Sequence, residues 1–271
     1  MNKKIDISFL YPCVKWVGGK SLQNKIIIPN ILQSLQKNQV YIEPFVGGGS
    51  VIIELLKQCY LNDINDVSFQ CYDINEIIIR MYNEIKNKPL ELIEKLKPFS
   101  DKNTKEDYYR IRNEYNANPS VEQFMYLNKN CFRGLYRVNK KGMFNTSFSH
   151  ARNPPVFVAE NIIELSKIFQ LYDVKFEVRD FFDLDIDNCV AYFDPPYYNT
   201  FDEYNVIRFN HDDYIERLIE IRSYSSVTLF HSNCYEFQNV YETDENIEEV
   251  SCQERMISKK QKAKRVELFY Y

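Results

Sequence analysis

The stretch CVAYFDPPYYN, residues 189–199, places one carboxylate between a predicted strand and two prolines. Residues 190–193 are apolar or aromatic, which is typical of a buried strand. A proline cannot donate to a sheet ladder, so the strand must end at Asp194, and Pro195 favours extended geometry at that residue. A carboxylate at the carboxyl end of a strand, followed by two tyrosine rings, indicates a ligand-binding edge of an α/β sheet. A rigid turn without a function is the alternative interpretation.

A glycine-rich turn in EPFVGGGS, residues 43–50, is the second candidate site. Its glycines let the backbone approach a ligand closely, and the helix that follows offers unpaired N–H groups. The spacing is not G-x-G-x-x-G, which disfavours a nucleotide-dependent oxidoreductase. Asp73 ends the next predicted strand, where an acid can accept hydrogen bonds from ribose hydroxyls. The alternatives are a plain tight turn for the glycines and a helix N-cap for Asp73.

A further glycine turn, KWVGGK at residues 15–20, carries Trp16, the only tryptophan of the chain. The local sequence leaves two interpretations open. Trp16 is either a core anchor between solvated lysines or part of a ligand site.

The composition indicates a globular protein that works without a metal. The chain has 271 residues, of which 45% are hydrophobic and 27% charged, and it has no apolar run long enough to span a membrane. The first residues do not have the pattern of a signal peptide. Seven scattered cysteines without a C-x-x-C pair indicate reduced thiols in the cytoplasm, and with three isolated histidines they argue against a metal site.

The charge distribution points to a polyanionic partner, although the net charge is −4. Residues 123–159 and 255–266 contain no Asp or Glu. Basic residues gather in both segments: Lys129, Arg133, Arg137, Lys140, Lys141 and Arg152 in the first, and Arg255, Lys259, Lys260, Lys262, Lys264 and Arg265 in the second. Each run alone would be typical of a solvated face, but two such runs in an acidic chain favour a nucleic-acid footprint.

The elements that must position these residues alternate between strand and helix. The pattern predicts strands at 40–45, 68–73, 175–181, 189–194 and 226–233, and helices at 47–59, 74–86 and 211–224. The cap of the last helix is predicted to be His211 or Asp212. Such alternation implies an α/β fold with a mainly parallel sheet. The alternation of strand and helix stops at residues 75–157, which are interpreted as an inserted domain within a core of residues 1–74 and 158–271.

The motifs in their order resemble one enzyme family. KWVGGK, EPFVGGGS, YDIN (72–75), a basic insert and DPPY (194–197) resemble the Dam-type, D12 class of N6-adenine-specific DNA methyltransferases. LNKNCFRGLYRVNKKGMFNTSF (127–148) is similar to the family segment N-x-x-x-F-N-G-L-x-R-x-N-x-x-G-x-F-N-x-P, and QERMISKKQKAKRVELF (253–269) is similar to its closing hairpin. The resemblance implies a Rossmann-like, S-adenosyl-L-methionine-dependent methyltransferase sheet with an inserted, mostly helical target-recognition domain.

The resemblance also implies roles for individual residues. Cofactor contacts would come from Trp16, Lys20, Phe45, Gly47, Asp73, Asp180 and Asp194. Catalysis would rest on Asp194, Pro195, Pro196 and Tyr197. Double-stranded DNA would be contacted by Lys15, Arg133, Leu135, Arg137, Asn139, Lys259, Lys260 and Lys262, with Arg137 reaching a base edge or, alternatively, only a phosphate.

This chemistry explains a carboxylate before two prolines. An adenine amino nitrogen is a poor nucleophile, because its lone pair is delocalised into the ring. The Asp194 carboxylate and the Pro195 carbonyl could each accept a hydrogen bond from that amino group and free the lone pair. The base must leave the duplex to be reached, and stacking on Tyr197 would offset part of the unstacking cost.

Two departures from the family segment fall in the part that would read sequence. Arg133 stands where the family has an asparagine, and Ser147 where it has a proline. The resemblance therefore does not imply recognition of GATC, and the sequence leaves the target undetermined. Three other functions remain open: methylation of amino groups in RNA or another polyanion, a Rossmann oxidoreductase, and a silent DNA-binding module, which would be expected to lack Asp194 or the glycine turn. The sequence predicts a cytoplasmic protein that acts on nucleoid or viral DNA and does not bind a membrane. A cognate restriction endonuclease is a possible partner, and the oligomeric state stays undetermined.

Overall fold

The architecture is that of a computed structural model, which describes residues 4–35, 39–149, 155–198, 209–241, 243, 246–258 and 261–271. The described strands are β1 (Val40–Glu43), β2 (Ser68–Asp73), β3 (Lys175–Val178), β4 (Cys189–Phe193), β5 (Val227–Cys234), β6 (Ile247–Ser258) and β7 (Gln261–Tyr270). The described helices are α1 (Asn24–Ser34), α2 (Ser50–Leu61), α3 (Glu76–Asn87), α4 (Pro89–Leu96), α5 (Lys105–Ala117), α6 (Val121–Asn130), α7 (Ala159–Leu171) and α8 (His211–Arg222).

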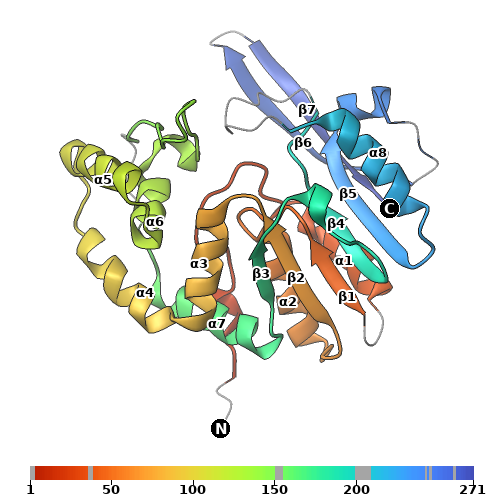
Figure 1. Ribbon diagram of the computed structural model, residues 1–271, viewed down its shortest axis with the longest axis horizontal. Helices are drawn as coiled ribbons and strands as arrows, with labels where there is room; N and C mark the ends of the chain where they lie inside the picture. Colours follow the sequence, from red (N-terminus) through yellow and green to blue (C-terminus); the bar gives the residue numbers. More distant parts are fainter. Residues whose placement is uncertain are drawn as a thin grey trace.

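The strands form one sheet in the order β3-β2-β1-β4-β5-β7-β6 (Figure 1). Strands β1 to β5 run parallel, and β7 is antiparallel to both β5 and β6. The chain order reverses between β1 and β4, so the crevice at their carboxyl ends is the place where such sheets bind ligands. The predicted parallel sheet and the closing hairpin are confirmed.

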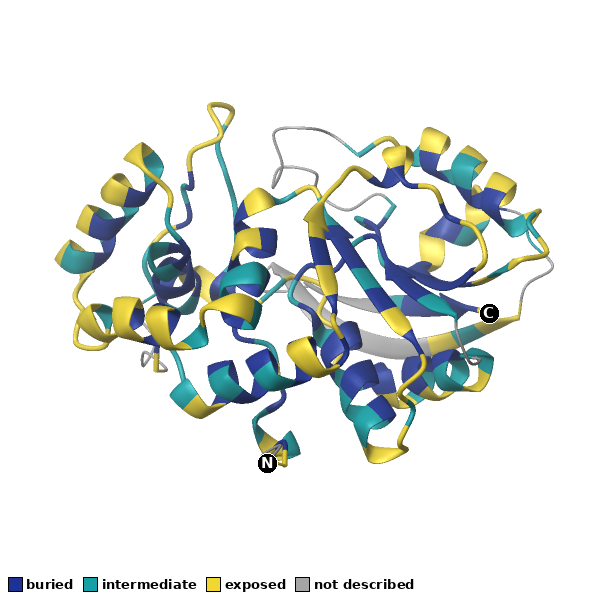
Figure 2. Ribbon diagram, turned by 60° about the horizontal axis from the view of Figure 1, so that its bottom comes forward, coloured by how far each residue is buried: buried dark blue, intermediate teal, exposed yellow. Residues whose placement is uncertain are grey.

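Helices cover both faces of the sheet because side chains alternate along each strand. On β1, Tyr41 packs into a core shared with α1, α2, α3, α6 and α7, whereas Ile42 packs into a second core shared with α8. Figure 2 shows the buried residues concentrated on the strands and on the inner sides of these helices.

The element bounds differ from the predicted ones at a few positions, each for a local reason. Strand β1 ends at Glu43 because Pro44 cannot continue the ladder. Helix α1 was not predicted, since Pro29 inside it argues against a helix, yet Ile27, Ile28 and Ile31 bury its inner face. The predicted cap of α8 is wrong: Asn210 accepts hydrogen bonds from the backbone N–H groups of Asp212 and Asp213.

Helices α4, α5 and α6 lie together beside the sheet, on the left in Figure 1. Helix α3, which the sequence assigned to the insert, instead packs on β3. The Tyr82 ring stacks on Phe176 at 4.6 Å, and Asn83 donates to the Phe176 carbonyl at 3.0 Å. The division into a core of 1–74 and 158–271 and an insert of 75–157 stays a proposal, and these contacts tie its first helix to the sheet.

Among the described residues, we find no helix that is long and apolar enough to cross a membrane.

Candidate active site

A buried ion pair joins the first sequence motif to the acid after β4. Lys20 Nζ lies 2.6 Å from Asp194 Oδ2, and the Lys20 side chain is only 1% exposed. The same ammonium donates to the Gly18 carbonyl at 2.6 Å, and the Lys20 backbone N–H donates to Ser50 Oγ at 2.8 Å. Lys20 is therefore fixed from both ends. The sequence predicted both residues of the pair as site residues but did not predict that they contact each other.

The Asp194 carboxylate retains capacity to accept hydrogen bonds. Its side chain is 18% exposed, Lys20 donates to Oδ2, and the Tyr197 side chain is a further hydrogen-bond partner of the carboxylate. Burial raises the pKa of Asp194, whereas Lys20 acts in the opposite direction and the Tyr197 side chain also lowers it. A carboxylate offers about four lone-pair sites, so Lys20 leaves acceptor positions for a ligand.

The DPPYY turn is fastened to the neighbouring strand. Asn233, which is fully buried near the end of β5, accepts hydrogen bonds from the backbone N–H groups of Tyr198 at 3.1 Å and Cys234 at 2.9 Å. The Tyr197 ring is 8% exposed and carries the Lys20 ammonium 4.9 Å from its centroid. Pro195 is buried and Pro196 half-buried. The turn is thus rigid in its backbone, which the diproline predicted.

The glycine turn after β1 makes room for Trp16. A Cβ atom on Gly47 or on Gly48 would lie 2.7 Å from a Trp16 side-chain atom, and Gly47 has a φ of +45°. The other side of the turn is held by Tyr82, whose hydroxyl donates to the Gly47 carbonyl at 2.8 Å. The close approach that the sequence assigned to a ligand is made by an indole ring. Trp16 also stacks on Tyr136, with 5.7 Å between the ring centroids, so it packs within the fold, and its predicted contact with the cofactor stays a prediction.

Asp73 lies beside the same turn. Its carboxylate accepts hydrogen bonds from the backbone N–H groups of Gly47 at 3.0 Å and Asn75 at 2.9 Å. The N-cap of α3 is Asn75, so the alternative role of Asp73 as the cap is wrong. Burial raises the pKa of Asp73 to about 6, and the backbone hydrogen bonds oppose the shift.

An aromatic cluster lies next to these acids. Phe45, directly after β1, packs against Phe181 at 5.2 Å, and the cluster extends to Phe193, Phe209 and Tyr214. Asp180 is exposed and accepts a hydrogen bond from the Phe182 backbone N–H at 3.1 Å. Sequence analysis singled out Phe45 and Asp180 but missed Phe209 and Tyr214, whose only signal is their aromatic character around the start of α8.

Four of the eight predicted DNA-binding residues lie in the loop at residues 131–148. Arg137 Nε donates to Asn145 Oδ1 at 2.7 Å, so the guanidinium plane is held from one side. Arg133 is exposed at a φ of +58°, a backbone conformation that asparagine tolerates better than most residues. Asn139 Oδ1 accepts hydrogen bonds from two backbone N–H groups of the same loop, and Leu135 is half-buried.

The remaining predicted DNA contacts are placed less completely. The side chain of Lys15 is exposed at the first motif. Lys259 and Lys260 lie outside the described residues, and Lys262 belongs to β7, where its backbone pairs with Met256.

Sequence analysis missed three buried polar side chains around the site: Glu43, Asn128 and Asn233. Glu43 ends β1, is 2% exposed and accepts a hydrogen bond from the Tyr41 hydroxyl at 3.0 Å. Burial raises its pKa well above the ordinary value. Glu43 is the last residue of a strand, and Asn128 stands at the first asparagine of the family segment at 127–148, which were the available signals. Asn233 carries no such signal.

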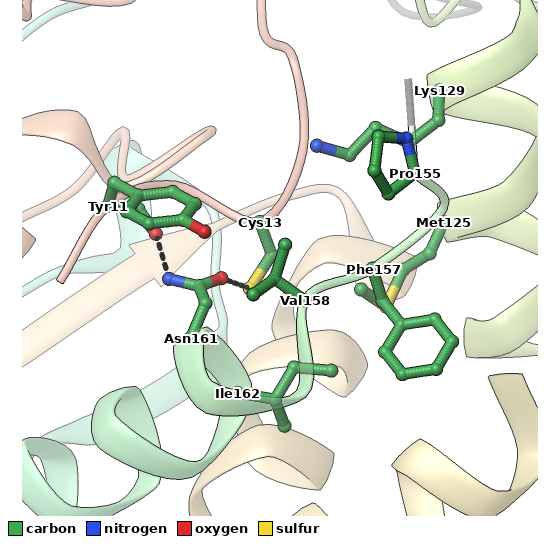
Figure 3. A pocket seen from close by; sticks show the side chains of 9 residues that line it. All are labelled: Tyr11, Cys13, Met125, Lys129, Pro155, Phe157, Val158, Asn161 and Ile162. Carbon is green, nitrogen blue, oxygen red and sulfur yellow. Dashed lines mark hydrogen bonds between the residues drawn. The ribbon is translucent and has the colours of Figure 1, made fainter. Parts of the chain in front are cut away.

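The pocket in Figure 3 is separate from these residues. It lies between the N-terminal segment, α6 and α7 and has a volume of about 20 Å³, room for about one water. None of the predicted site residues lines it. Within the described part of the chain, no group of three or more His, Cys, Asp or Glu residues could hold a metal ion. The prediction that the enzyme needs no metal stays a prediction.

The parallel sheet ends in an antiparallel hairpin, and two acids flank the β1/β4 crevice, Glu43 at the end of β1 and Asp194 directly after β4. This architecture is consistent with a Rossmann-like methyltransferase. A sequence profile of the D12 class N6 adenine-specific DNA methyltransferases matches residues 16–264, and the chain belongs to this family. It is 36% identical to the type II methyltransferase M.MjaIII of Methanocaldococcus jannaschii over 228 residues, which cover 75% of the chain and 76% of that protein.

Other relatives carry the same activity in their names. The chain is 30% identical to the type II methyltransferase M1.LlaDCHI of Lactococcus lactis over 76% of its length and 74% of that protein's. It is 30% identical to the DNA adenine methylase of Escherichia coli K12 over 68% of its length and 64% of that protein's. The protein is an adenine-specific DNA methyltransferase, as the sequence motifs predicted.

Proposed function

We propose that this methyltransferase transfers a methyl group from S-adenosyl-L-methionine to N6 of an adenine that has left a DNA duplex. The observation that carries the proposal is Asp194, a carboxylate at the β1/β4 crevice that Lys20 holds by one oxygen. A carboxylate offers about four lone-pair sites, so it can accept a hydrogen bond from a ligand in addition to those from Lys20 and Tyr197. The amino group of an extruded adenine can donate that hydrogen bond.

The residues around the crevice fit S-adenosyl-L-methionine. Asp73 presents a carboxylate at the end of β2, where ribose hydroxyls could donate to it. The half-buried Phe45 offers an apolar face to an adenine ring, the buried Phe181 packs behind it, and Asp180 precedes Phe181 in the chain. Trp16 lies against Gly47 and Lys20 contacts Asp194, and we propose that these residues also line the cofactor. The cofactor would supply a methyl group already activated on a sulfonium.

The protein then has to orient the amino group. Asp194 accepts a hydrogen bond from one amino hydrogen, and the Pro195 carbonyl accepts one from the other. Both acceptors belong to the turn after β4, which Asn233 holds through the Tyr198 N–H. Pro196 restricts the direction of that carbonyl. Lys20 favours the ionised form of Asp194, and its ammonium lies 4.9 Å from the centroid of the Tyr197 ring, so one cation contacts both residues that are proposed to hold the base.

Two segments are proposed to hold DNA. Arg133, Leu135, Arg137 and Asn139 place the 131–148 loop against the duplex, with Lys15 beside it, while Lys259, Lys260 and Lys262 in the closing hairpin contact phosphates. Because DNA is the substrate, we place the enzyme with nucleoid or viral DNA. The names of the type II relatives also make a cognate restriction endonuclease a partner to look for.

Labelled S-adenosyl-L-methionine offered in parallel with duplex DNA, RNA and protein tests the proposal. Transfer to duplex DNA is the expected result, with sequencing of the methylated DNA to give the target site. Labelling of RNA or protein in preference to DNA would refute the substrate assignment.

Cofactor affinity is expected to depend on the ionisation of Asp73. Its carboxyl has a pKa of about 6, and only the carboxylate accepts a hydrogen bond from a ribose hydroxyl with both oxygens. Affinity should therefore be constant above pH 7 and should weaken as the pH falls through 6, toward tenfold per unit. Calorimetric titration of the product S-adenosylhomocysteine from pH 5 to 8 measures this. An Asp73→Asn variant should bind more weakly with a flat profile; an equally steep profile in that variant would assign the titration to another group.

Arg137→Ala is expected to relax selectivity at one base pair of the target. Because Asn145 holds only one side of the guanidinium, its remaining N–H groups can donate to O6 and N7 of a guanine, a contact worth ~1–3 kcal/mol. Methylation profiling of random duplex DNA compares the variant with the wild type. Lys141→Ala, an exposed change in the same loop, should slow methylation equally on all sequences. If Arg137→Ala behaves like Lys141→Ala, Arg137 holds only a phosphate.

A further inference from the structure

One buried side chain of the insert holds the backbone of the first motif. Asn128, on α6, is 1% exposed. Its Oδ1 accepts a hydrogen bond from the Lys15 N–H at 2.8 Å, and its Nδ2 donates to the Lys15 carbonyl at 2.8 Å. The same Nδ2 donates to the Gly134 carbonyl at 3.2 Å. A single amide group therefore joins the residue before Trp16 to the 131–148 loop.

The two segments also pack without space between them. Gly134 has a φ of +67°, and a Cβ atom there would lie 2.4 Å from the Lys15 Cβ. One residue after Lys15 and two residues after Gly134, the Trp16 indole stacks on Tyr136. Close-packed groups of this kind move together, so a displacement of the loop must displace the 15–20 motif or break these contacts.

The chain before this junction is anchored separately. Asn161, on α7, donates to the Tyr11 carbonyl at 2.9 Å and accepts a hydrogen bond from the Cys13 thiol at 2.9 Å, as Figure 3 shows. The first motif is thus held at both ends, by the contacts of Asn161 just before it and by the Lys20–Asp194 pair at its last residue. Between them, Asn128 ties the motif to the 131–148 loop by hydrogen bonds, and Trp16 packs on Tyr136 of the same loop.

We propose that Asn128 is a positioning residue that couples DNA binding at the 131–148 loop to cofactor binding at residues 15–20. The inference rests on the proposed function, which assigns these two segments to the two ligands. A ligand that orders one segment orders the other through the Asn128 amide, so the second ligand meets a site that is already arranged. Linkage makes the effect reciprocal.

The test is the ratio of S-adenosylhomocysteine dissociation constants, measured by calorimetry without DNA and with saturating target duplex. In the wild type we expect DNA to tighten binding roughly tenfold, within the usual range of such couplings. Asn128→Asp keeps the acceptor for the Lys15 N–H but places an oxygen against two carbonyls. In this variant the ratio should fall to within about twofold of one.

Asn130→Asp is the matched control. Asn130 is also 1% exposed and also on α6, but its Nδ2 donates to the Tyr126 carbonyl of its own helix. This variant should keep the wild-type ratio. A wild-type ratio of one, or an unchanged ratio in Asn128→Asp, overturns the proposal.

Hydrogen exchange on the wild type gives a second readout that does not depend on a variant. DNA should slow exchange at the Lys15 amide, and S-adenosylhomocysteine should slow it at the Gly134 and Leu135 amides; absence of either effect overturns the coupling. Arg137→Ala distinguishes a failure of the proposed function from a failure of this inference. If the variant binds DNA as tightly as the wild type, the assignment of the 131–148 loop to DNA is wrong. If the variant binds DNA more weakly but DNA does not change the affinity of the wild type for S-adenosylhomocysteine, only the role of Asn128 is refuted.

Discussion

Asp194→Ala should lower kcat by about 10²–10³-fold while cofactor and DNA still bind, the size seen when one transition-state hydrogen bond is removed from a preorganised site. The hydrogen bond from the adenine amino group to Asp194 matters most when the nitrogen attacks, so the loss should appear in kcat and not in affinity. Single-turnover methylation at saturating cofactor and DNA measures it.

Asp185→Ala is the control for this change. Asp185 is an exposed acid on the segment that leads into β4. It should methylate at the wild-type rate. Normal turnover in Asp194→Ala would refute the proposed mechanism. Because this variant leaves the buried Lys20 ammonium without its partner, it should also be less stable than Asp185→Ala, and turnover is measured at a temperature at which both variants are folded.

Lys20→Met should destabilise the protein by about 3 kcal/mol and shift its activity to higher pH. Removing one partner of a buried pair leaves the other charge uncompensated, at a typical cost of ~3–5 kcal/mol, and the partial exposure of Asp194 places the expected value at the low end. Lys20 lowers the pKa of Asp194, so its removal raises that pKa and moves the acid limb of the kcat profile to higher pH.

The sign of the stability change with pH provides a check on this prediction. A carboxyl whose folded-state pKa is raised binds its proton more tightly in the folded chain, so the destabilisation should grow as the pH rises through that pKa and shrink in acid. Denaturant unfolding at several pH values measures it. Lys25→Met, a change at an exposed lysine in α1, should leave stability and the profile unaltered. A stability loss that does not vary with pH would show that Lys20 acts only through packing.

Local patterns were sufficient for the sheet of the core. Strands β2 and β4 are apolar runs that end at an acid or a proline, and their bounds follow from those residues alone. Helix α1 could not be recognised in this way, because Pro29 costs one backbone hydrogen bond and the burial of three isoleucines compensates for it. That burial depends on tertiary packing, which no local window contains.

The candidate site divides along the same line. Asp194 and Asp73 carry a strand-end signal, whereas Lys20 is chemically an ordinary lysine until the fold brings it to Asp194, 174 residues further along the chain. The glycines of the turn after β1 were recognised, but the reason for them was not, since Trp16 reaches them from a different motif. Asn128 and Asn233 act through backbone groups distant in sequence, and pairings of this kind leave no mark in composition or spacing.

The most direct test of the central claim is the identity of the methylated nucleoside. Duplex DNA treated with the enzyme and S-adenosyl-L-methionine is digested to nucleosides, which are separated and weighed by mass spectrometry, with Asp194→Ala in parallel. The geometry at Asp194 predicts N6-methyldeoxyadenosine from the wild type and, from the variant, a yield lower by the fall in kcat. Methylated deoxycytidine in its place, or equal yields of N6-methyldeoxyadenosine from both proteins, would contradict the account.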